Sequence, residues 1–188
     1  ATLATMKVAG LILAGGEGRR MGGVDKGLQH FQDQPLVQHV IERLTPQVDA
    51  LWISANRNMS TYADFGHPVF SDAEKWHAQG PLAGIVSFMA ILPAHYDAVQ
   101  IMPCDVPFFP LDLTAQLVDN LGDAGMVYPC TDDAAHYACT LVRRSCLPSA
   151  LRQLEHKQLS LRAWLHNNHA VALTGFNSSD FVNINALP

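Results

Sequence analysis

The sequence predicts an α/β fold, a single domain of three layers in which helices cover both faces of a mostly parallel sheet. Short apolar runs of strand length alternate with amphipathic runs of helix length, and the connections between them are short. The first apolar run, Lys7 to Leu13, is continuously apolar after its lysine, which indicates a strand buried on both faces. We expect the domain to span residues 1–188, with residues 1–5 as a leader or an expression remnant.

The other elements follow in order along the chain. Apolar residues that recur on one helical face predict helices, and Pro35 and Pro81 suit first-turn positions. The predicted helices cover residues 35–44, 81–92, 110–121, 147–155 and 159–167. The later predicted strands cover residues 50–54, 67–72, 97–105, 124–130, 136–144 and 170–175. The strand at 136–144 is a candidate for antiparallel pairing. Ligands of such sheets bind beyond the carboxyl ends of the strands.

Composition argues against several classes of function. Lys and Arg number 12 and Asp and Glu 17, a formal net charge of −5, whereas general nucleic-acid binders usually carry a basic surplus. No apolar run approaches the ~20 residues that span a bilayer, and no signal peptide is recognised. The cysteines form no C-x-x-C pair. We therefore expect a cytoplasmic protein with reduced thiols and with neither a nucleic acid nor a membrane as partner.

The segment from Leu13 to Lys26, LAGGEGRRMGGVDK, gathers glycines, adjacent arginines and a lysine directly after the first strand. Glycines let backbone N–H groups approach phosphate oxygens, and the cations neutralise phosphate charge. A P-loop is excluded because Gly27 follows the lysine where that motif needs Ser or Thr. The dinucleotide fingerprint fails because Met21 replaces its third glycine. We therefore interpret the segment as a loop that binds a nucleoside triphosphate.

Several segments together resemble the molybdenum cofactor guanylyltransferases (molybdopterin-guanine dinucleotide synthases). The glycine-rich segment matches that family's signature L-A-G-G-x-x-x-R-M-G-G-x-D-K. The other matching segments are SANR (54–57), SD (71–72), GPLAG (80–84), PCDVPF (103–108) and FVNIN (181–185). The resemblance covers essentially the whole chain. It implies the Rossmann-like nucleotidyltransferase fold of the glycosyltransferase-A type.

The resemblance also implies a reaction. GMP would pass from GTP to the terminal phosphate of molybdopterin or molybdenum-molybdopterin, with Mg²⁺ as cofactor and pyrophosphate as the second product. In-line attack on the α-phosphorus depends on positioning and charge neutralisation. Two alternatives stay open: a relative that uses CTP or another phosphorylated small molecule, and a GTP-dependent cofactor carrier without catalysis. The implied protein partners are a molybdopterin-supplying protein and an acceptor apoenzyme.

Five residues are expected to be catalytic. Asp105 ends a buried strand, and it is the expected ligand of Mg²⁺, which takes few protein carboxylates. By the resemblance, Lys26 reaches the phosphates and Arg20 stabilises charge on the α-phosphoryl group or the pyrophosphate. Asn183 and Asn185 alternate, which predicts that both lie on one face of a strand; the resemblance implies that they belong to the catalytic pocket. The family usually continues from there into a helix, which we expect to be missing or reduced.

Other residues are expected to contact the nucleotide. A carboxylate at Asp72 could accept from N1–H and N2–H₂ of guanine together, and the resemblance implies a nucleotide-contacting aspartate there. Ser54 replaces the first asparagine of the NANR found in several family members, whereas Asn56 keeps the amide of that loop. His136 is the histidine expected to touch pterin or nucleotide. The expected nucleotide-binding residues are Leu13, Ala14, Gly15, Gly16, Gly23, Lys26, Ser54, Asn56, Asp72, Gly80 and Asp105.

Overall fold

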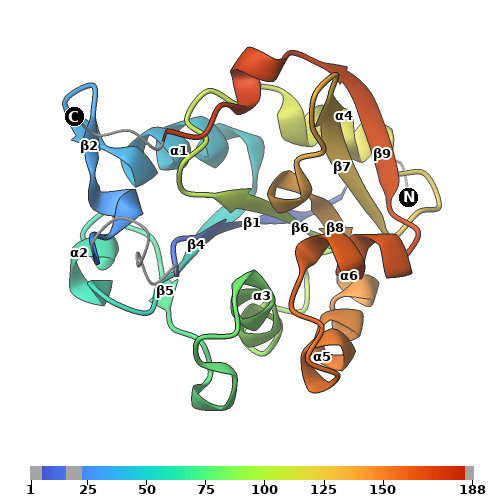
Figure 1. The fold of residues 1–188 in the computed structure, drawn as a ribbon, viewed down its shortest axis with the longest axis horizontal. Helices are drawn as coiled ribbons and strands as arrows, with labels where there is room; N and C mark the ends of the chain where they lie inside the picture. The colour runs from blue at the N-terminus through green and yellow to red at the C-terminus, as the bar shows by residue number, and fades with distance from the viewer. Residues whose placement is uncertain (1–5, 16–22, 185–188) are drawn as a thin grey trace.

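A central sheet organises the fold (Figure 1), which a computed structural model describes for residues 6–15 and 23–184. Among these residues, seven strands pair in the order β5-β4-β1-β6-β8-β7-β9. Their bounds are Val8–Leu13 (β1), Ala50–Ser54 (β4), Val69–Phe70 (β5), Ala98–Pro103 (β6), Met126–Thr131 (β7), Leu141–Arg143 (β8) and Val171–Phe176 (β9). Only β8 runs antiparallel to its neighbours β6 and β7. The prediction of a mostly parallel sheet is therefore confirmed.

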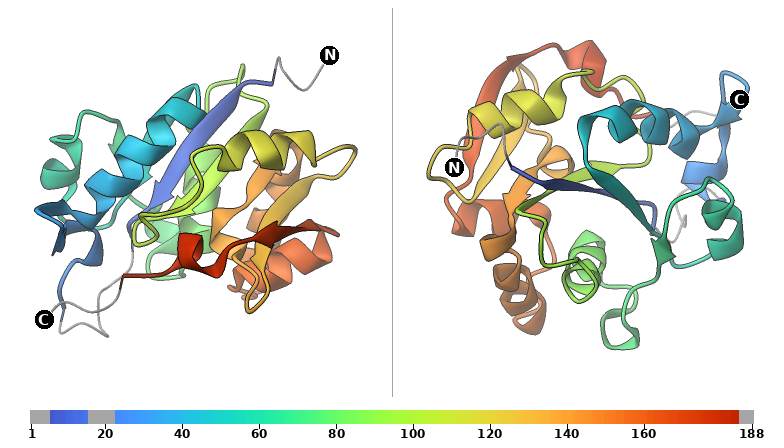
Figure 2. Two further views of the ribbon diagram at one scale, coloured as in Figure 1. Left: turned by 90° about the horizontal axis from the view of Figure 1, so that it is seen from above. Right: turned by 180° about the vertical axis from the view of Figure 1, so that it is seen from behind.

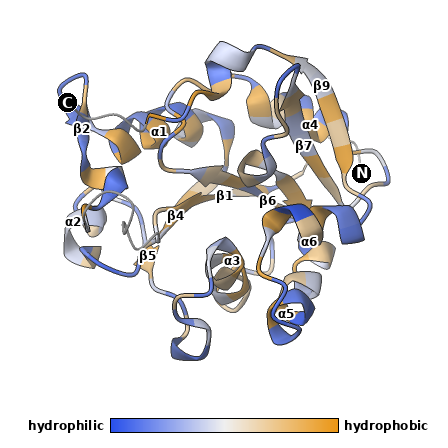
Figure 3. Ribbon diagram, in the orientation of Figure 1, coloured by the Kyte–Doolittle hydropathy of each residue, from blue (hydrophilic) through white to orange (hydrophobic). Residues whose placement is uncertain are grey.

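Helices cover both faces of this sheet, as the two views of Figure 2 also show. One face carries α1 (Leu36–Leu44) and α4 (Leu113–Asp119). The other face carries α3 (Pro81–Met89), α5 (Pro148–Glu155) and α6 (Leu161–Asn167). Each side has its own apolar core, and β1 contributes alternately to both, as expected for a strand covered on two faces. Figure 3 shows this arrangement as hydrophobic central strands with hydrophilic residues in the outer segments.

The predictions of individual helices and strands were most accurate where the apolar face of the element is long. The predicted apolar face of α1 is buried in full; it consists of Leu36, Val37, Val40, Ile41 and Leu44. Sequence reasoning missed the hairpin of β2 (His30–Phe31) and β3 (Gln34–Pro35) and the short helix α2 (Met59–Ala63). These elements have too few residues to show a period, and α2 buries only Tyr62.

Two strand predictions were wrong in part. The predicted strand at 136–144 begins as a 3-10 helix, Tyr137–Cys139, and only its end forms β8. The segment FVNIN is not a strand either, because Phe181 ends a second 3-10 helix, Ser178–Phe181, and no strand follows in the described residues. The backbone N–H of Ile184 instead donates to the carbonyl of Asp105 at 2.9 Å. This contact holds the end of the described chain beside the residue that follows β6.

Two further expectations concern the whole chain. All four cysteines are free, and Cys104 and Cys139 are buried. In the part of the chain that the structure describes, every helix falls short of the length and apolarity needed to cross a bilayer.

Candidate active site

The loops that carry the predicted site residues start side by side at one edge of the sheet. β1 lies between β4 and β6, and all three run parallel. The N–H of Ala14 donates to the carbonyl of Ser54 at 2.8 Å, and the N–H of Ala55 donates to that of Phe70 at 2.9 Å. The chain thus leaves β1, β4 and β5 at one place, the carboxyl edge where α/β sheets bind ligands.

The structure brings together two predicted catalytic residues that lie far apart in the sequence. Lys26 Nζ is 2.5 Å from Asp105 Oδ2. The Lys26 side chain is 27% exposed and that of Asp105 is 15% exposed, so the pair is shielded but reachable from one side. Lys26 begins the 3-10 helix Lys26–Leu28, and Asp105 follows the end of β6. The pair places a cation and a carboxylate where the strands end.

A single carboxylate is compatible with a magnesium site of this kind. The described residues hold no group of three or more His, Cys, Asp or Glu side chains that could bind a metal by themselves. Mg²⁺ does not require such a group, because it usually binds one or two carboxylates and completes its shell with phosphate oxygens and water. Asp105 presents an oxygen beside Lys26 at the end of β6, so its position fits that coordination.

Asp25 is a site residue that sequence reasoning missed. It is 8% exposed, and its carboxylate is surrounded by donors. The Tyr62 hydroxyl donates to Oδ1 at 2.6 Å, and Asn58 Nδ2 donates to Oδ2 at 3.0 Å. Arg57 Nε lies 3.9 Å from the same Oδ2. The signal was present in the D-K of the glycine-rich segment, but the partners of Asp25 lie in and just before a helix too short to predict, Met59–Ala63.

Asp72 and Asn56 form a rigid unit beside the glycine-rich segment. Asn56 Nδ2 donates to Asp72 Oδ2 at 3.0 Å and to the Gly15 carbonyl at 3.2 Å, and the Asp72 N–H donates to Asn56 Oδ1 at 2.9 Å. The second carboxylate oxygen, Asp72 Oδ1, is buried and has no hydrogen-bond partner among the described residues. Burial raises the pKa of Asp72, partly offset by the hydrogen bond from Asn56. The unused acceptor is therefore available to a ligand that donates to it.

Close packing explains the glycines around this unit. A Cβ on Gly15 would lie 2.9 Å from Asn56 Nδ2, and one on Gly84 would lie 2.9 Å from Ser54 Oγ and 3.6 Å from Asp72 Oδ1. The Ser54 hydroxyl is thus buried between strand β4 and helix α3. Gly80 precedes α3 at φ +75°, which a side chain would strain. The GPLAG segment therefore sets how closely α3 approaches Ser54 and Asp72.

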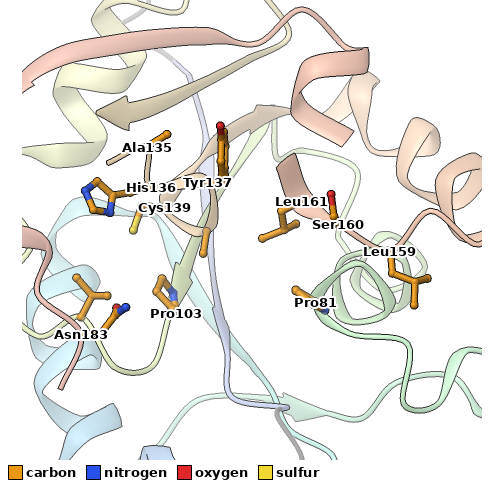
Figure 4. Close-up of a pocket in the computed structure, with 12 residues that line it drawn as sticks. Pro81, Pro103, Ala135, His136, Tyr137, Cys139, Leu159, Ser160, Leu161 and Asn183 are labelled. Atoms are coloured by element: carbon orange, nitrogen blue, oxygen red, sulfur yellow. The ribbon is translucent and has the colours of Figure 1, made fainter. Parts of the chain in front are cut away.

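A pocket of about 390 Å³ opens near the end of β6 (Figure 4). Pro103 and Val106, two residues before and one residue after Asp105, are part of its wall. His136 and Asn183 lie on one side of it, opposite Leu161 and Pro81. The lining residues are Pro81, Pro103, Val106, Ala135, His136, Tyr137, Ala138, Cys139, Leu159, Ser160, Leu161 and Asn183.

His136 has a defined place in this pocket. Its ring stacks on Phe181 with centroids 4.5 Å apart and planes 16° from parallel, and its Nε2 is 3.1 Å from the Thr131 hydroxyl. Burial lowers the pKa of His136, partly offset by the charge of Asp133, and so favours the neutral ring. The ring is therefore an aromatic surface rather than a cation.

Some of the remaining predicted residues lie in the described part of the chain, and others lie outside it. Leu13 and Ala14 end and follow β1 as predicted, and the Gly23 carbonyl accepts from Arg57 Nη1 at 2.5 Å. Three predicted residues lie outside the described part of the chain: Gly16, Arg20 and Asn185.

Comparison with known proteins identifies the family. The profile of the MobA-like NTP transferase domain matches residues 10–171. The chain belongs to this family. It is 41% identical over 186 residues to the molybdenum cofactor guanylyltransferase of Pasteurella multocida (strain Pm70), which covers 97% of each chain. It is 36% identical over 185 residues to the enzyme of the same name from Shewanella woodyi (strain ATCC 51908 / MS32), covering 96% of this chain and 92% of the relative.

A solved structure supports the fold. Molybdopterin-guanine dinucleotide biosynthesis protein A from Archaeoglobus fulgidus superposes with a TM-score of 0.70 at 17% identity, covering 88% of this chain and 83% of that one. The resemblance seen in the sequence motifs is therefore confirmed, and the chain is a nucleotidyltransferase of the molybdenum cofactor guanylyltransferase family.

Proposed function

We propose that the protein transfers GMP from GTP to the terminal phosphate of molybdopterin and releases pyrophosphate. One observation carries the proposal: a short stretch of chain after β6 serves both a charged pair and a pocket. The Asp105 carboxylate meets Lys26 at 2.5 Å. Pro103 and Val106, close to Asp105 in the chain, line the 390 Å³ pocket. A reaction that joins a nucleotide to a second substrate needs this arrangement.

Asp72 supports guanine as the base. Its Oδ1 is an unused buried acceptor, and its Oδ2 is held by Asn56. Guanine offers N1–H and N2–H₂ as neighbouring donors, whereas cytosine lacks that pair. A buried acceptor left unpaired is costly, which favours the base that can donate to it. The N4 amino group of cytosine can also donate to a single acceptor, so the nucleotide comparison below is what distinguishes GTP from CTP.

Lys26 and Asp105 would change partners when the nucleotide binds. In the structure the two side chains form an ion pair with one another. With GTP present, Lys26 would turn to the phosphate oxygens, and the Asp105 carboxylate would hold Mg²⁺ together with those oxygens. The bound ion would supply neutralisation of charge on the reacting phosphates. The ion pair thus keeps both groups in place before the substrate arrives.

The pocket next to Asp105 would hold molybdopterin. Its lining is largely apolar, and the His136 ring stacked on Phe181 offers a flat surface to a planar heterocycle. The terminal phosphate of molybdopterin is already an anion, so no side chain has to remove a proton from it before attack. Burial and the Asp105 carboxylate raise the pKa of the Cys104 thiol to about 12, which leaves it protonated and unsuited as a nucleophile. Direct transfer to the acceptor fits these groups.

The decisive experiment measures pyrophosphate release. Purified protein with Mg²⁺ would be incubated with GTP, CTP, ATP or UTP, each with and without molybdopterin. Release only with GTP and molybdopterin is the expected result, and loss of release with EDTA would support the metal. Release with CTP would point to the cytosine-using alternative. GTP binding without release would favour the non-catalytic carrier. The supplying and accepting proteins, and a cytoplasmic location, remain predictions.

A further inference from the structure

The residues on both sides of Lys26 are held by one short segment, 57–62, that ends inside helix α2. Asp25 precedes Lys26 and receives hydrogen bonds from Tyr62 and Asn58 at 2.6 and 3.0 Å. Gly27 follows Lys26, and a Cβ there would lie only 2.5 Å from the Tyr62 hydroxyl oxygen. The Tyr62 hydroxyl therefore touches the backbone on one side of the lysine while it binds the carboxylate on the other.

The same segment also fixes the chain before Asp25. Arg57 Nη1 donates to the Gly23 carbonyl at 2.5 Å, and its Nε lies 3.9 Å from Asp25 Oδ2. Asp25 further shapes the turn that carries Lys26, because its carbonyl accepts from the N–H of Leu28 at 3.1 Å. Side chains and backbone of residues 23–28 are thus tied to residues 57–62 at several points.

From this geometry we infer that Asp25, Asn58 and Tyr62 are positioning residues that set the direction of Lys26 toward the phosphates of GTP. Both carboxylate oxygens of Asp25 already accept from protein donors, which argues against a role as metal ligand. Tyr62 is fully buried, and burial with the nearby Asp25 carboxylate raises its pKa, so its hydroxyl keeps the proton that it donates. The inference rests on the proposed phosphate role of Lys26.

A purely structural role is the competing explanation, and it makes a different prediction. If Tyr62 acts through Lys26, its removal should matter only while Lys26 is present. If Tyr62 only stabilises the fold, its removal should cost the same with or without the lysine. The test is therefore a double-mutant cycle on GTP binding, measured by calorimetry with Mg²⁺ on the full chain.

Tyr62→Phe keeps the ring packing and removes only the hydroxyl. We expect it to weaken GTP affinity about tenfold, the size of one hydrogen bond to a charged group. In a Lys26→Ala background the same change should alter affinity less than about twofold. Tyr96→Phe is the matched control, at a buried tyrosine near the start of β6. It should leave GTP affinity unchanged.

A rescue variant provides a second readout. Asp25→Asn leaves one acceptor oxygen where the carboxylate had two, so Tyr62 and Asn58 can no longer both donate to this side chain and GTP affinity should fall. Adding Asn58→Asp reverses the hydrogen bond, keeps the net charge and should restore most of the affinity.

Three results would overturn the inference. Equal losses for Tyr62→Phe in both backgrounds would show a structural role. If Lys26→Ala weakened GTP affinity and Tyr62→Phe did not, the proposed phosphate role of Lys26 would stand and the positioning role of Tyr62 would be removed. Unchanged GTP affinity in Lys26→Ala would contradict the phosphate role of the lysine itself, and the inference would fall with it.

Discussion

Around Asp25, Asn56 and Asp72, the region proposed as the nucleotide side, polar side chains from separate loops bind one another, whereas the wall of the pocket proposed as the acceptor side is mostly apolar and aromatic. Asn56 bridges Asp72 and Gly15, and Asp25 is held by Asn58 and Tyr62. The pocket instead consists largely of Pro, Ala, Leu and aromatic side chains. The difference suits the two substrates proposed: a triphosphate needs fixed charges and donors, and a flat heterocycle needs apolar surface.

This comparison predicts that substitutions on the two sides should have distinguishable effects on the reaction. Polar networks position groups to within a fraction of an ångström, so losing one member should cost a specific contact. Apolar walls contribute many small contacts, so losing one member should cost less. Variants of Asp105, which lies between the sides, should affect the reaction most.

The largest effect is expected for Asp105→Ala. The change removes the proposed metal ligand and leaves Lys26 without the carboxylate that lies 2.5 Å away. We expect pyrophosphate release to fall about a hundredfold or more, the usual result of removing a group that stabilises charge in the transition state. Circular dichroism should show a retained fold. Asp112→Ala, an exposed carboxylate in the same connection after β6, is the control. Near wild-type turnover in Asp105→Ala would remove this residue from the site.

The next effect is expected for Asp72→Asn on the nucleotide side. Replacing the buried, unpaired Oδ1 alters the acceptor proposed for guanine. A hydrogen bond to a charged group contributes about 1.5–3 kcal/mol, so GTP affinity should fall about 10- to 100-fold. The KM for molybdopterin should stay unchanged. Asp64→Asn removes an exposed carboxylate and should bind GTP normally. If Asp72→Asn bound GTP as tightly as the wild type, Asp72 would not read the base.

The same difference explains what the sequence could predict. The residues proposed for the nucleotide side follow the ends of strands and belong to short sequence motifs. Lys26, Asp72 and Asp105 could therefore be predicted from those motifs and the family resemblance together. The direct meeting of Lys26 and Asp105 depends on the order of β1, β4 and β6, which the pattern of apolar runs does not specify. The proposed acceptor side has no such motif, and part of its wall comes from a 3-10 helix, Tyr137–Cys139, whose alternating pattern predicted a strand.

Asp25 and the tail show a second limit. A buried carboxylate can be predicted only if its donors are known, and those donors lie at the start of α2 (Asn58) and within it (Tyr62), a helix of five residues. The FVNIN alternation predicted a strand, but the N–H of Ile184 bonds to the Asp105 carbonyl instead of a neighbouring strand. In both cases a tertiary hydrogen bond decided the local structure, and local pattern carries no information about it.

A smaller effect is expected for His136→Ala on the acceptor side. The change removes the ring that stacks on Phe181 and lines the pocket. An aromatic contact contributes about 0.5–1.5 kcal/mol, so the KM for molybdopterin should rise about 2- to 10-fold. GTP affinity should not change, the reverse of the pattern for Asp72→Asn. His95→Ala, an exposed histidine before β6, is the control. A loss of GTP affinity in His136→Ala would mean that the two sides are not separate.

The smallest effect concerns the pH dependence of stability. Burial raises the pKa of Asp72, with the Asn56 hydrogen bond and the charge of His77 acting in the opposite direction. The folded protein therefore holds this proton to a higher pH than the unfolded chain does. The resulting stabilisation is complete below the ordinary pKa of about 3.9 and is lost as pH rises through the raised value.

Urea unfolding between pH 3.5 and 7 can isolate this contribution. The quantity to follow is the free energy of unfolding of the wild type minus that of Asp72→Asn. This difference should be largest at pH 3.5 and should decrease as pH rises. The Asp64→Asn control should show no such trend, because that carboxylate is exposed. A difference that grows with pH would mean that Asp72 is stabilised as an anion. Donors of the protein itself would then pair with the Asp72 carboxylate oxygen proposed to accept from guanine. The hydrogen bonding of the polar side would then not require the nucleotide.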